Sequence, residues 1–256
     1  MKVVKPKILP VTNPTPLHND LTLLRLPFMA QNHSDIANLA SKSGDGHLDF
    51  LAKLVEGEIN LRRDRTTLRR IENARFPVIK TLDAFFWSWP KSINRMAVQD
   101  IFRLEFCNKN ENIIFLGSVG LGKSHLASAL GYAACLAGKS VLFTTAVDVI
   151  NSLAAAQAAN RLKNELKKYT APSILIIDEL GYLPVDKLGC DLLFQVFSQR
   201  YERGSIIITS NRAYKDWPEI FNNDSMLTSA LLDRLLHHAQ TVIIEGKSYR
   251  MKDHLD

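Results

Sequence analysis

The chain has 256 residues, of which 46% are hydrophobic and 23% are charged, values typical of a globular protein that buries a core. They exclude wholesale disorder, a peptide hormone and a disulfide-stapled miniprotein. The three cysteines form no CxxC pair, which favours neither a disulfide framework nor a zinc knuckle. The sequence shows neither a signal-peptide core nor an apolar stretch of about 18 residues, so we expect a cytoplasmic protein.

The net charge of +6 is concentrated in the N-terminal part of the chain. Residues 1–110 hold 17 Lys and Arg against 11 Asp and Glu, whereas residues 111–256 hold 15 of each. This asymmetry predicts a neutral body joined to a basic segment that meets a polyanion, most often nucleic acid. The alternative is a solvated basic surface that only keeps the protein soluble.

The first elements are an arm and a helical stretch. Residues 1–16 carry three basic side chains and four prolines, which predicts a flexible basic arm. Over residues 21–39 the apolar positions recur at helical spacing, with Asn19 or Asp20 as the expected N-cap and Pro27 as an interruption.

A turn at residues 44–46 precedes the longest helix expected in this part, residues 47–74. Its second half has a basic arc, while Leu61, Leu68 and Ile71 lie roughly opposite. We expect this helix, within a helical N-terminal domain over residues 17–76, to offer guanidinium groups to DNA phosphates. The alternative is an ordinary amphipathic helix with a solvated face. The candidate DNA contacts on the arc are Arg62, Arg63, Arg65, Arg69 and Arg70.

Residues 77–92 are rich in aromatic side chains and begin at Pro77, which ends the helix. Phe85, Phe86, Trp87 and Trp89 predict an aromatic linker whose rings dock onto a surface between domains. Stacking of these rings on nucleic-acid bases is the alternative.

From residue 111 the pattern changes to short, β-branched apolar runs separated by helical stretches, as in strands buried on both faces. Between the second and third runs lies an Ala-rich, then basic, helical stretch. This alternation predicts a parallel α/β sheet within a domain over residues 93–256. The five expected strands are residues 112–116, 141–144, 174–177, 206–209 and 242–244.

Residues 117–124 read GSVGLGKS and fit the phosphate-binding loop pattern GxxxxGK[ST] between an expected strand and helix. Glycines let backbone N–H groups approach phosphate oxygens, and the helix N-terminus favours negative charge. Lys123 is expected to neutralise the β- and γ-phosphates, and Ser124 to bind Mg²⁺ through its hydroxyl.

Two later strands end in polar residues that complete such a site. Asp178 at a strand tip is expected to hold Mg²⁺ through water, and Glu179 to act as the base that polarises the attacking water. Asn211 follows another buried strand and is expected to hydrogen-bond the water or the γ-phosphate. A polar turn that merely ends the strand is the alternative for Asn211.

Several blocks closely resemble the IstB-like family of transposition helper ATPases, AAA+ proteins related to DnaC-type helicase loaders. The resemblance spans about residues 17–252. It implies an AAA+ P-loop NTPase fold with a five-stranded sheet of order 5-1-4-3-2, ATP as the nucleotide, and oligomers that bind ATP between neighbouring copies. The blocks are RFP at 75–77, KTL at 80–82, the phosphate loop with HLA at 125–127, IIDELGYLP at 176–184, RYERG at 200–204, TSN at 209–211, Trp217, LDRLLHH at 232–238 and SYR at 248–250.

Matched residue by residue, the resemblance places Lys123 and Ser124 in Walker A, Asp178 and Glu179 in Walker B, and Asn211 at sensor 1. It also implies that Arg234 is the arginine finger given to the next copy and that Arg250 is sensor 2. Arg212 competes with Arg234 for the finger role. Ser118 and Val119 stand where the family usually has prolines, which leaves the Gly-Lys-Ser chemistry intact. The expected nucleotide-binding set is Gly117, Ser118, Val119, Gly120, Leu121, Gly122, Lys123, Ser124 and His125.

The function implied is a Mg²⁺-dependent ATPase that converts ATP to ADP and phosphate, assembles on duplex DNA without sequence specificity, and assists a transposase in target selection and strand transfer. The resemblance also places further DNA contacts at Lys163, Lys167 and Lys168, in a helical insertion of this clade.

Three alternatives remain. One is a replicative helicase loader with the same ATPase core, another an architectural DNA binder with a degenerate nucleotide site, and a remote third a small-metabolite kinase. His125, His237 and His238 have no matching carboxylate spacing, so we expect no zinc site from them.

Overall fold

The computed structural model describes residues 15–249 and residue 251. The expected arm therefore lies almost wholly outside the described residues, and so does Arg250. The chain divides into two compact units, residues 1–69 and 70–256, which we describe separately. In the part of the chain that the structure describes, no helix combines the length and the apolarity needed to span a membrane.

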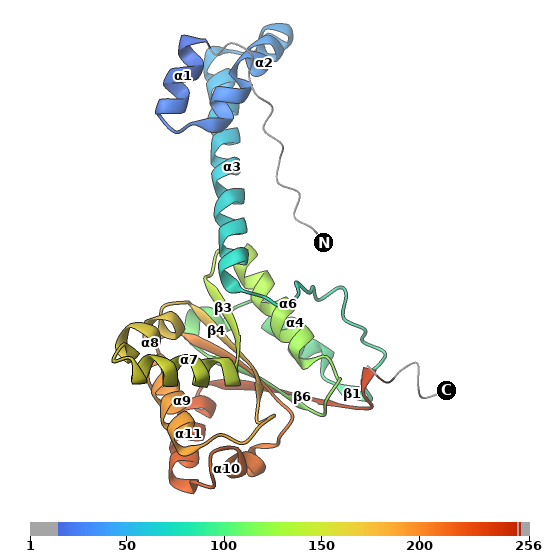
Figure 1. The fold of residues 1–256 in the computed structure, drawn as a ribbon. Helices are drawn as coiled ribbons and strands as arrows, with labels where there is room; N and C mark the ends of the chain where they lie inside the picture. The colour runs from blue at the N-terminus through green and yellow to red at the C-terminus, as the bar shows by residue number, and fades with distance from the viewer. Residues whose placement is uncertain (1–14, 250, 252–256) are drawn as a thin grey trace. The chain divides into compact units, whose positions relative to one another are not determined.

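Helices build the described part of the first unit: α1 (Pro16–Leu23), α2 (Pro27–Ser43) and α3 (His47–Ala74), of which α3 continues into the second unit (Figure 1). The predicted range of α3 and the turn before it are confirmed. The predicted interruption at Pro27 is confirmed: α1 ends at Leu23, and Pro27 begins α2, because proline needs no N–H partner in a first helical turn. The predicted N-cap was wrong: Thr15 accepts from the N–H of His18, and Asn19 and Asp20 lie inside α1.

Two neighbouring residues of α3 hold the start of α2. A Cβ at Gly57 would lie 2.0 Å from the ring of Phe28, so the ring packs directly on the helix backbone there. Glu58 is buried, and its carboxylate accepts from the N–H of Phe28 at 2.8 Å and from Nε of Arg62 at 3.2 Å. Leu26 caps α2 without a side-chain hydrogen bond, so Glu58 supplies an acceptor that the helix start lacks.

A six-stranded sheet of order β1-β6-β2-β5-β4-β3 forms the centre of the second unit (Figure 1). In the numbering of the five expected strands this contains the order 5-1-4-3-2, which is confirmed. The expected count of five is corrected, because a two-residue strand pairs antiparallel with the edge of β6. The strands are β1 (Ser92–Ile93), β2 (Asn112–Gly117), β3 (Val141–Thr145), β4 (Ile174–Leu180), β5 (Ser205–Ser210) and β6 (Ala239–Glu245).

Alternate residues of the central strands face two separate cores. Ile113 and Phe115 of β2 pack with α4, α5 and α6, whereas Ile114 and Leu116 pack with the helices from α7 to α11. Burial on both faces explains the continuous β-branched runs in the sequence. The helices are α4 (Arg95–Ile101), α5 (Phe106–Lys109), α6 (Lys123–Leu136), α7 (Ala146–Ala158), α8 (Leu162–Thr170), α9 (Lys187–Arg200), α10 (Trp217–Ile220) and α11 (Ser225–Leu236), with a 3₁₀ turn η1 (Tyr214–Asp216).

The aromatic segment 77–92 packs within the second unit. Phe85 is buried in the core beneath α6, and Trp87 packs against the same core. The indole N–H of Trp89 donates to the carbonyl oxygen of Lys247 at 2.8 Å. The predicted docking of these rings is therefore seen on the sheet domain itself, while their role as a tie between domains stays a prediction.

Arg200, at the end of α9, fixes the turn that leads into β5. It is 1% exposed and donates to the carbonyl oxygens of Tyr169, Pro172, Ser173 and Ser205 at 2.7–3.1 Å. Burial lowers the pKa of its guanidinium to about 10, so the group remains charged at neutral pH. These bonds give the turn over residues 201–204 a rigid base.

Candidate functional site

The phosphate-type loop joins the C-terminal end of β2 to the start of α6. Gly122 occupies its last position with φ +86°, a left-handed conformation that favours glycine, and a Cβ there would lie 2.7 Å from the ring of Phe85. The first turn of α6 begins directly after it, at Lys123. The sequence therefore builds an anion-binding helix N-terminus at the edge of the sheet.

Lys123 is held at this loop. Its side chain is largely buried, and its ammonium donates to the carbonyl oxygens of Gly117 at 2.7 Å and Ser118 at 2.8 Å. The positive charge is thus concentrated where the loop and the helix N-terminus meet, which makes the loop a favourable place for phosphate oxygens.

Asp178 is the point at which three elements meet. It is 7% exposed, and its Oδ1 accepts a hydrogen bond from the Ser124 hydroxyl of α6 at 2.8 Å. The hydroxyl of Thr209 on β5 donates to the same oxygen. Because β5 lies between β2 and β4, the predicted proximity of these strand ends is confirmed. A hydroxyl and a carboxylate side by side are oxygen ligands of the kind Mg²⁺ prefers.

Glu179 follows Asp178 in an irregular part of the strand. The pairing of β4 with β5 shifts register between Ile177 and Leu180, and Glu179 has φ +61°. Its N–H donates to the Thr209 hydroxyl at 3.0 Å, and its side chain is exposed. A bulge turns a side chain away from the alternation of a strand, and here it leaves Glu179 beside the buried Asp178. Strained backbone of this kind concentrates at functional sites.

A cavity of about 610 Å³ opens next to the loop, which is within the range of small-molecule sites. Its lining contains the polar groups described above, together with Gly120, Leu121 and His125 of the loop and helix. The lining also contains an aromatic shelf, which we define as Phe85, Phe86, Trp89 and Tyr249. The cavity thus joins a cationic, N–H-rich end to a surface of flat rings.

The chain after β6 contributes to this cavity. The N–H of Tyr249 donates to the carbonyl oxygen of Gly120 at 2.9 Å, and the Tyr249 ring lies edge-on to that of Trp89, with centroids 5.3 Å apart. This places the segment before Arg250 against the loop. Arg250 itself lies outside the described residues.

His125 also borders the cavity, on the first turn of α6. Its Nε2 lies 2.9 Å from the carbonyl oxygen of Thr81, and its ring lies edge-on to Phe85. Burial lowers the pKa of its imidazole, although the bond to Thr81 acts in the other direction. His125 lies close to the loop as predicted, but as a largely neutral group.

The structure does not bring the other predicted residues into this cavity. Among the described residues, its lining contains neither Asn211, Arg212 nor Arg234. Asn211 is exposed, just past the end of β5. Arg212 pairs with Glu219 at 3.7 Å, whereas Arg234 on α11 donates to the carbonyl oxygen of Ala230 and its guanidinium lies 5.0 Å from the centre of the Phe194 ring.

The candidate DNA contacts differ in their surroundings. Arg62 bonds Glu58 and, through Nη2, the carbonyl oxygen of Arg25 at 2.9 Å, so it is committed to packing within the first unit. Arg70, in the second unit, lies near Gly138. Lys168 on α8 pairs with Glu165 at 3.0 Å. The candidates that are exposed, with no ion pair recorded among the described residues, are Arg63, Arg65, Arg69, Lys163 and Lys167.

Sequence reasoning did not assign Thr209 or the aromatic shelf to the site. Thr209 carries a visible signal, a hydroxyl in an otherwise apolar buried strand, but its two partners are 30 or more residues away. The shelf combines rings from residues 85–89 with one from residue 249, and no local pattern links them.

Solved structures with a similar fold identify the fold class as AAA+ P-loop. A DNA replication initiation factor is 25% identical with a TM-score of 0.54, over 68% of this chain and 52% of that chain. The DnaC helicase loader is 22% identical with a TM-score of 0.52, over 69% of this chain and 99% of that chain. DnaA from Aquifex aeolicus, bound to AMPPCP, is 21% identical with a TM-score of 0.56, over 70% and 54%.

Sequence comparison gives the particular family. The model of the IstB-like ATP binding protein matches residues 19–256. A protein of insertion sequence IS232 from Bacillus thuringiensis subsp. berliner, named for ATP binding, is 40% identical over 93% of this chain and 95% of its own length. One of insertion sequence IS21 from Pseudomonas aeruginosa, named likewise, is 39% identical over 91% and 88%. The chain belongs to the family of IstB-like ATP-binding proteins.

We predict that Thr209→Val destabilises the second unit by about 1–3 kcal/mol, because Asp178 loses a donor and the N–H of Glu179 loses its acceptor. Urea unfolding followed by tryptophan fluorescence measures this, since Trp87, Trp89 and Trp217 all lie in that unit. Thr209→Ser keeps the hydroxyl and is the matched control. Equal stability of the Val and Ser variants would contradict the prediction.

Proposed function

We propose that this protein is a Mg²⁺-dependent ATPase that assembles on duplex DNA and assists a transposase in target selection and strand transfer. The observation that carries the proposal is the convergence of Ser124 and Thr209 on Asp178, beside the loop that holds Lys123. It puts phosphate-binding and metal-binding groups into one cavity. Membership of a family whose relatives are named for ATP binding and for insertion sequences supports the biological setting.

The proposed hydrolysis uses groups already close together. The N–H groups at the start of α6 and the Lys123 ammonium bind the phosphates, and Ser124 and Asp178 are the ligands for Mg²⁺. Bound Mg²⁺ supplies positive charge against the phosphate oxygens. Glu179, exposed beside the buried Asp178, accepts a proton from the attacking water. Asn211 is proposed to orient that water.

The aromatic shelf is proposed to hold the base of the nucleotide. Phe86, Trp89 and Tyr249 provide flat, partly exposed rings in the same cavity as the phosphate loop. Stacking on such rings is worth about 1–3 kcal/mol for a base and tolerates any base identity. The shelf therefore supports the binding of a nucleotide. That this nucleotide is ATP is inferred from the family to which the chain belongs.

We predict that Glu179→Gln lowers ATP turnover by a factor on the order of 10² to 10⁴, because the amide cannot accept the proton. Binding of ATP changes little, since Lys123, Ser124 and Asp178 are intact. Phosphate release and fluorescent-nucleotide binding measure the two effects. Asp191→Asn, a similar change at an exposed site on α9, is the control. Unchanged turnover in the Gln variant would remove Glu179 as the base.

Assembly is proposed to complete the site. Among the described residues, neither Arg212 nor Arg234 borders the cavity of its own chain, which fits an arginine finger given to a neighbouring copy, and we assign this role to Arg234. Arg250 is proposed to act within the same chain. An arginine that meets its phosphate partner only across an interface makes the interface depend on ATP.

We predict that Arg234→Ala binds nucleotide within about twofold of the unchanged protein but lowers turnover about 10³-fold, the scale of an arginine finger. Sedimentation with a nonhydrolysable ATP analogue and duplex DNA should show loss of the assembly. Arg203→Ala, which removes an exposed arginine elsewhere, is the control. If Arg212→Ala shows these losses and Arg234→Ala does not, the finger is Arg212.

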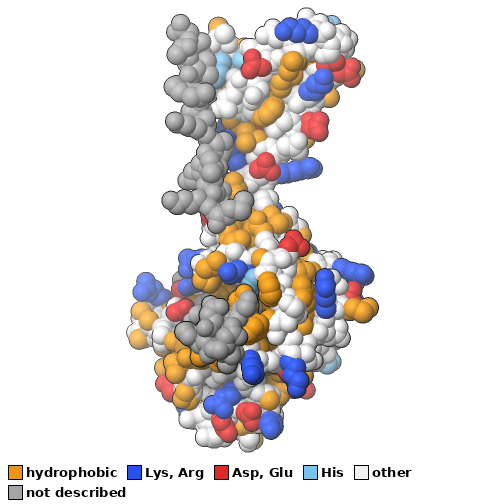
Figure 2. Space-filling model, turned by 90° about the vertical axis from the view of Figure 1, so that its right-hand side faces the viewer, with side chains coloured by type: hydrophobic (Ala, Val, Ile, Leu, Met, Phe, Trp, Pro, Cys, Tyr) orange, Lys and Arg blue, Asp and Glu red, His pale blue; other side chains and the backbone are white. Residues whose placement is uncertain are grey.

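DNA binding is proposed to use the exposed basic side chains of α3 and α8. On the face of the first unit that Figure 2 shows, Lys and Arg side chains stand among acidic ones. Contacts of such side chains with phosphates carry no sequence information, which agrees with binding to duplex DNA of any sequence. The proposed contacts are Arg63, Arg65, Arg69, Lys163 and Lys167, while Arg62 and Lys168 have partners within the protein and Arg70 is half-buried.

We predict that Arg65→Ala combined with Arg69→Ala weakens duplex binding for all sequences and reduces the slope of log K against log salt by about 2, one unit for each lost phosphate contact. Fluorescence anisotropy over a salt series measures the slope. Lys42→Ala combined with Lys53→Ala removes the same charge from the same unit, outside the arc, and should leave the slope unchanged. Equal slopes in both variants would place the DNA surface elsewhere.

A further inference from the structure

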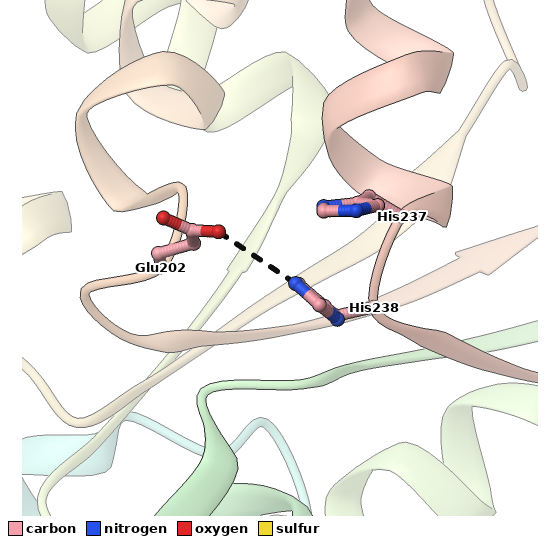
Figure 3. Close-up of side chains that lie close together, drawn as sticks. All are labelled: Glu202, His237 and His238. Carbon is pink, nitrogen blue, oxygen red and sulfur yellow. Dashed lines mark ion pairs between the residues drawn. The ribbon is translucent and has the colours of Figure 1, made fainter.

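Three metal-binding side chains lie together at a place that the nucleotide cavity does not reach. Glu202 is in the turn between α9 and β5, and His237 and His238 follow α11 (Figure 3). All three are exposed, and one ligand atom from each lies within 4.8 Å of the others. His238 Nε2 lies 3.6 Å from Glu202 Oε1. Along the sequence, no carboxylate lies at metal-ligand spacing from the histidine pair. The fold brings the carboxylate of Glu202 close to the pair, although Glu202 precedes His237 by 35 residues.

The backbone on both sides of this cluster is held in place. The Arg200 guanidinium donates hydrogen bonds to four carbonyl oxygens and so stabilises the turn in which Glu202 lies. The carbonyl oxygen of His238 accepts from the N–H of Asn112 at 2.7 Å, where β2 begins. The backbone at Glu202 and at His238 therefore does not need to move for the three side chains to meet. Only the side-chain torsion angles have to change.

We propose that Glu202, His237 and His238 bind a divalent transition-metal ion, with Zn²⁺ as the best fit, and leave a fourth position to water. Two imidazoles and one carboxylate form a borderline donor set that suits Zn²⁺, whereas Mg²⁺ prefers oxygen ligands alone. Tetrahedral Zn²⁺ keeps such ligand atoms about 3.4 Å apart, given bonds of about 2.1 Å. The 3.6 Å pair is close to this spacing, and the remaining separations, which are at most 4.8 Å, need to shorten by up to about 1.4 Å.

Tyr201 supplies the support that a metal-binding histidine requires. Its hydroxyl lies 2.8 Å from Nδ1 of His237. When Nδ1–H donates to that oxygen, the lone pair of Nε2 is free for the ion, which is the usual arrangement around histidine ligands. The rings of His237 and His238 lie 4.0 Å apart at 45°, so two adjacent residues present separate nitrogens to one side.

Bound metal would join two parts of the ATPase fold. It would link the end of α11, which carries Arg234, to the turn that α9 and Arg200 hold. Without metal the same contact is an exposed His–Glu pair, which contributes little to stability. The site itself does not depend on the proposed ATPase function, because none of its three ligands lines the nucleotide cavity.

The test uses the untagged full chain, freed of metal and kept in excess Mg²⁺. Co²⁺ titration followed by visible absorption reports both affinity and geometry, because four-coordinate Co²⁺ absorbs far more strongly than the six-coordinate ion, and Zn²⁺ competition then gives the Zn²⁺ affinity. We expect one ion per chain with the intense spectrum, and at least a tenfold loss of affinity in each of His237→Ala, His238→Ala and Glu202→Gln.

His47→Ala, which removes an exposed histidine of the first unit, is the matched control and should bind like the unchanged protein. Unchanged tryptophan fluorescence and urea unfolding without metal show that each variant folds. Equal affinity in the control and the three ligand variants, or only the weak six-coordinate spectrum, would overturn the proposal. Retained metal binding in Glu179→Gln separates this result from any failure of the ATPase proposal.

Discussion

The shared acceptor Oδ1 of Asp178 is the interaction on which the rest of the site depends. A buried carboxylate is costly unless hydrogen bonds offset its lost hydration, and here the hydroxyls of Ser124 and Thr209 provide them. Those bonds tie α6, β4 and β5 together at one edge of the sheet. Because Thr209 also accepts from the N–H of Glu179, the same network sets the bulge that exposes Glu179. The proposed Mg²⁺ ligands, the start of α6 and the proposed base therefore share one support.

The sequence was sufficient for features that depend on local pattern. Strands buried on both faces leave continuous β-branched runs, and the loop pattern between a strand and a helix places Lys123 and Ser124 without further information. The resemblance to the family, not the local pattern, supplied the strand order. The two-residue β1 was missed because its sequence carries too few positions for any periodicity, and it exists only through pairing with β6.

Features that depend on long-range partners were not predictable in this way. The helical arc of α3 groups Arg62 with Arg65 by angle alone, yet Arg62 bonds a buried glutamate and the carbonyl oxygen of Arg25. Angular position tells which side chains share a face, but it does not tell which charge already has a partner. The same holds for Glu202, whose nearness to His238 arises only after α9, β5 and α11 have packed. The first case shows why charge counts overestimate the surface available for ligands, and the second shows that packing creates clusters which spacing along the sequence does not reveal.

The position of Arg234 gives the proposed assembly a thermodynamic consequence. Its guanidinium lies over Phe194 and away from the nucleotide cavity of its own chain, so one chain can bind ATP without it. If ATP strengthens the contact between copies by some factor, assembly must strengthen ATP binding by the same factor, since the two are linked. Duplex DNA bound as proposed would add phosphate contacts in every copy and so raise the effective concentration of neighbours. Hydrolysis would remove the γ-phosphate that Arg234 is proposed to contact. It would therefore weaken both the contact between copies and the binding of the nucleotide.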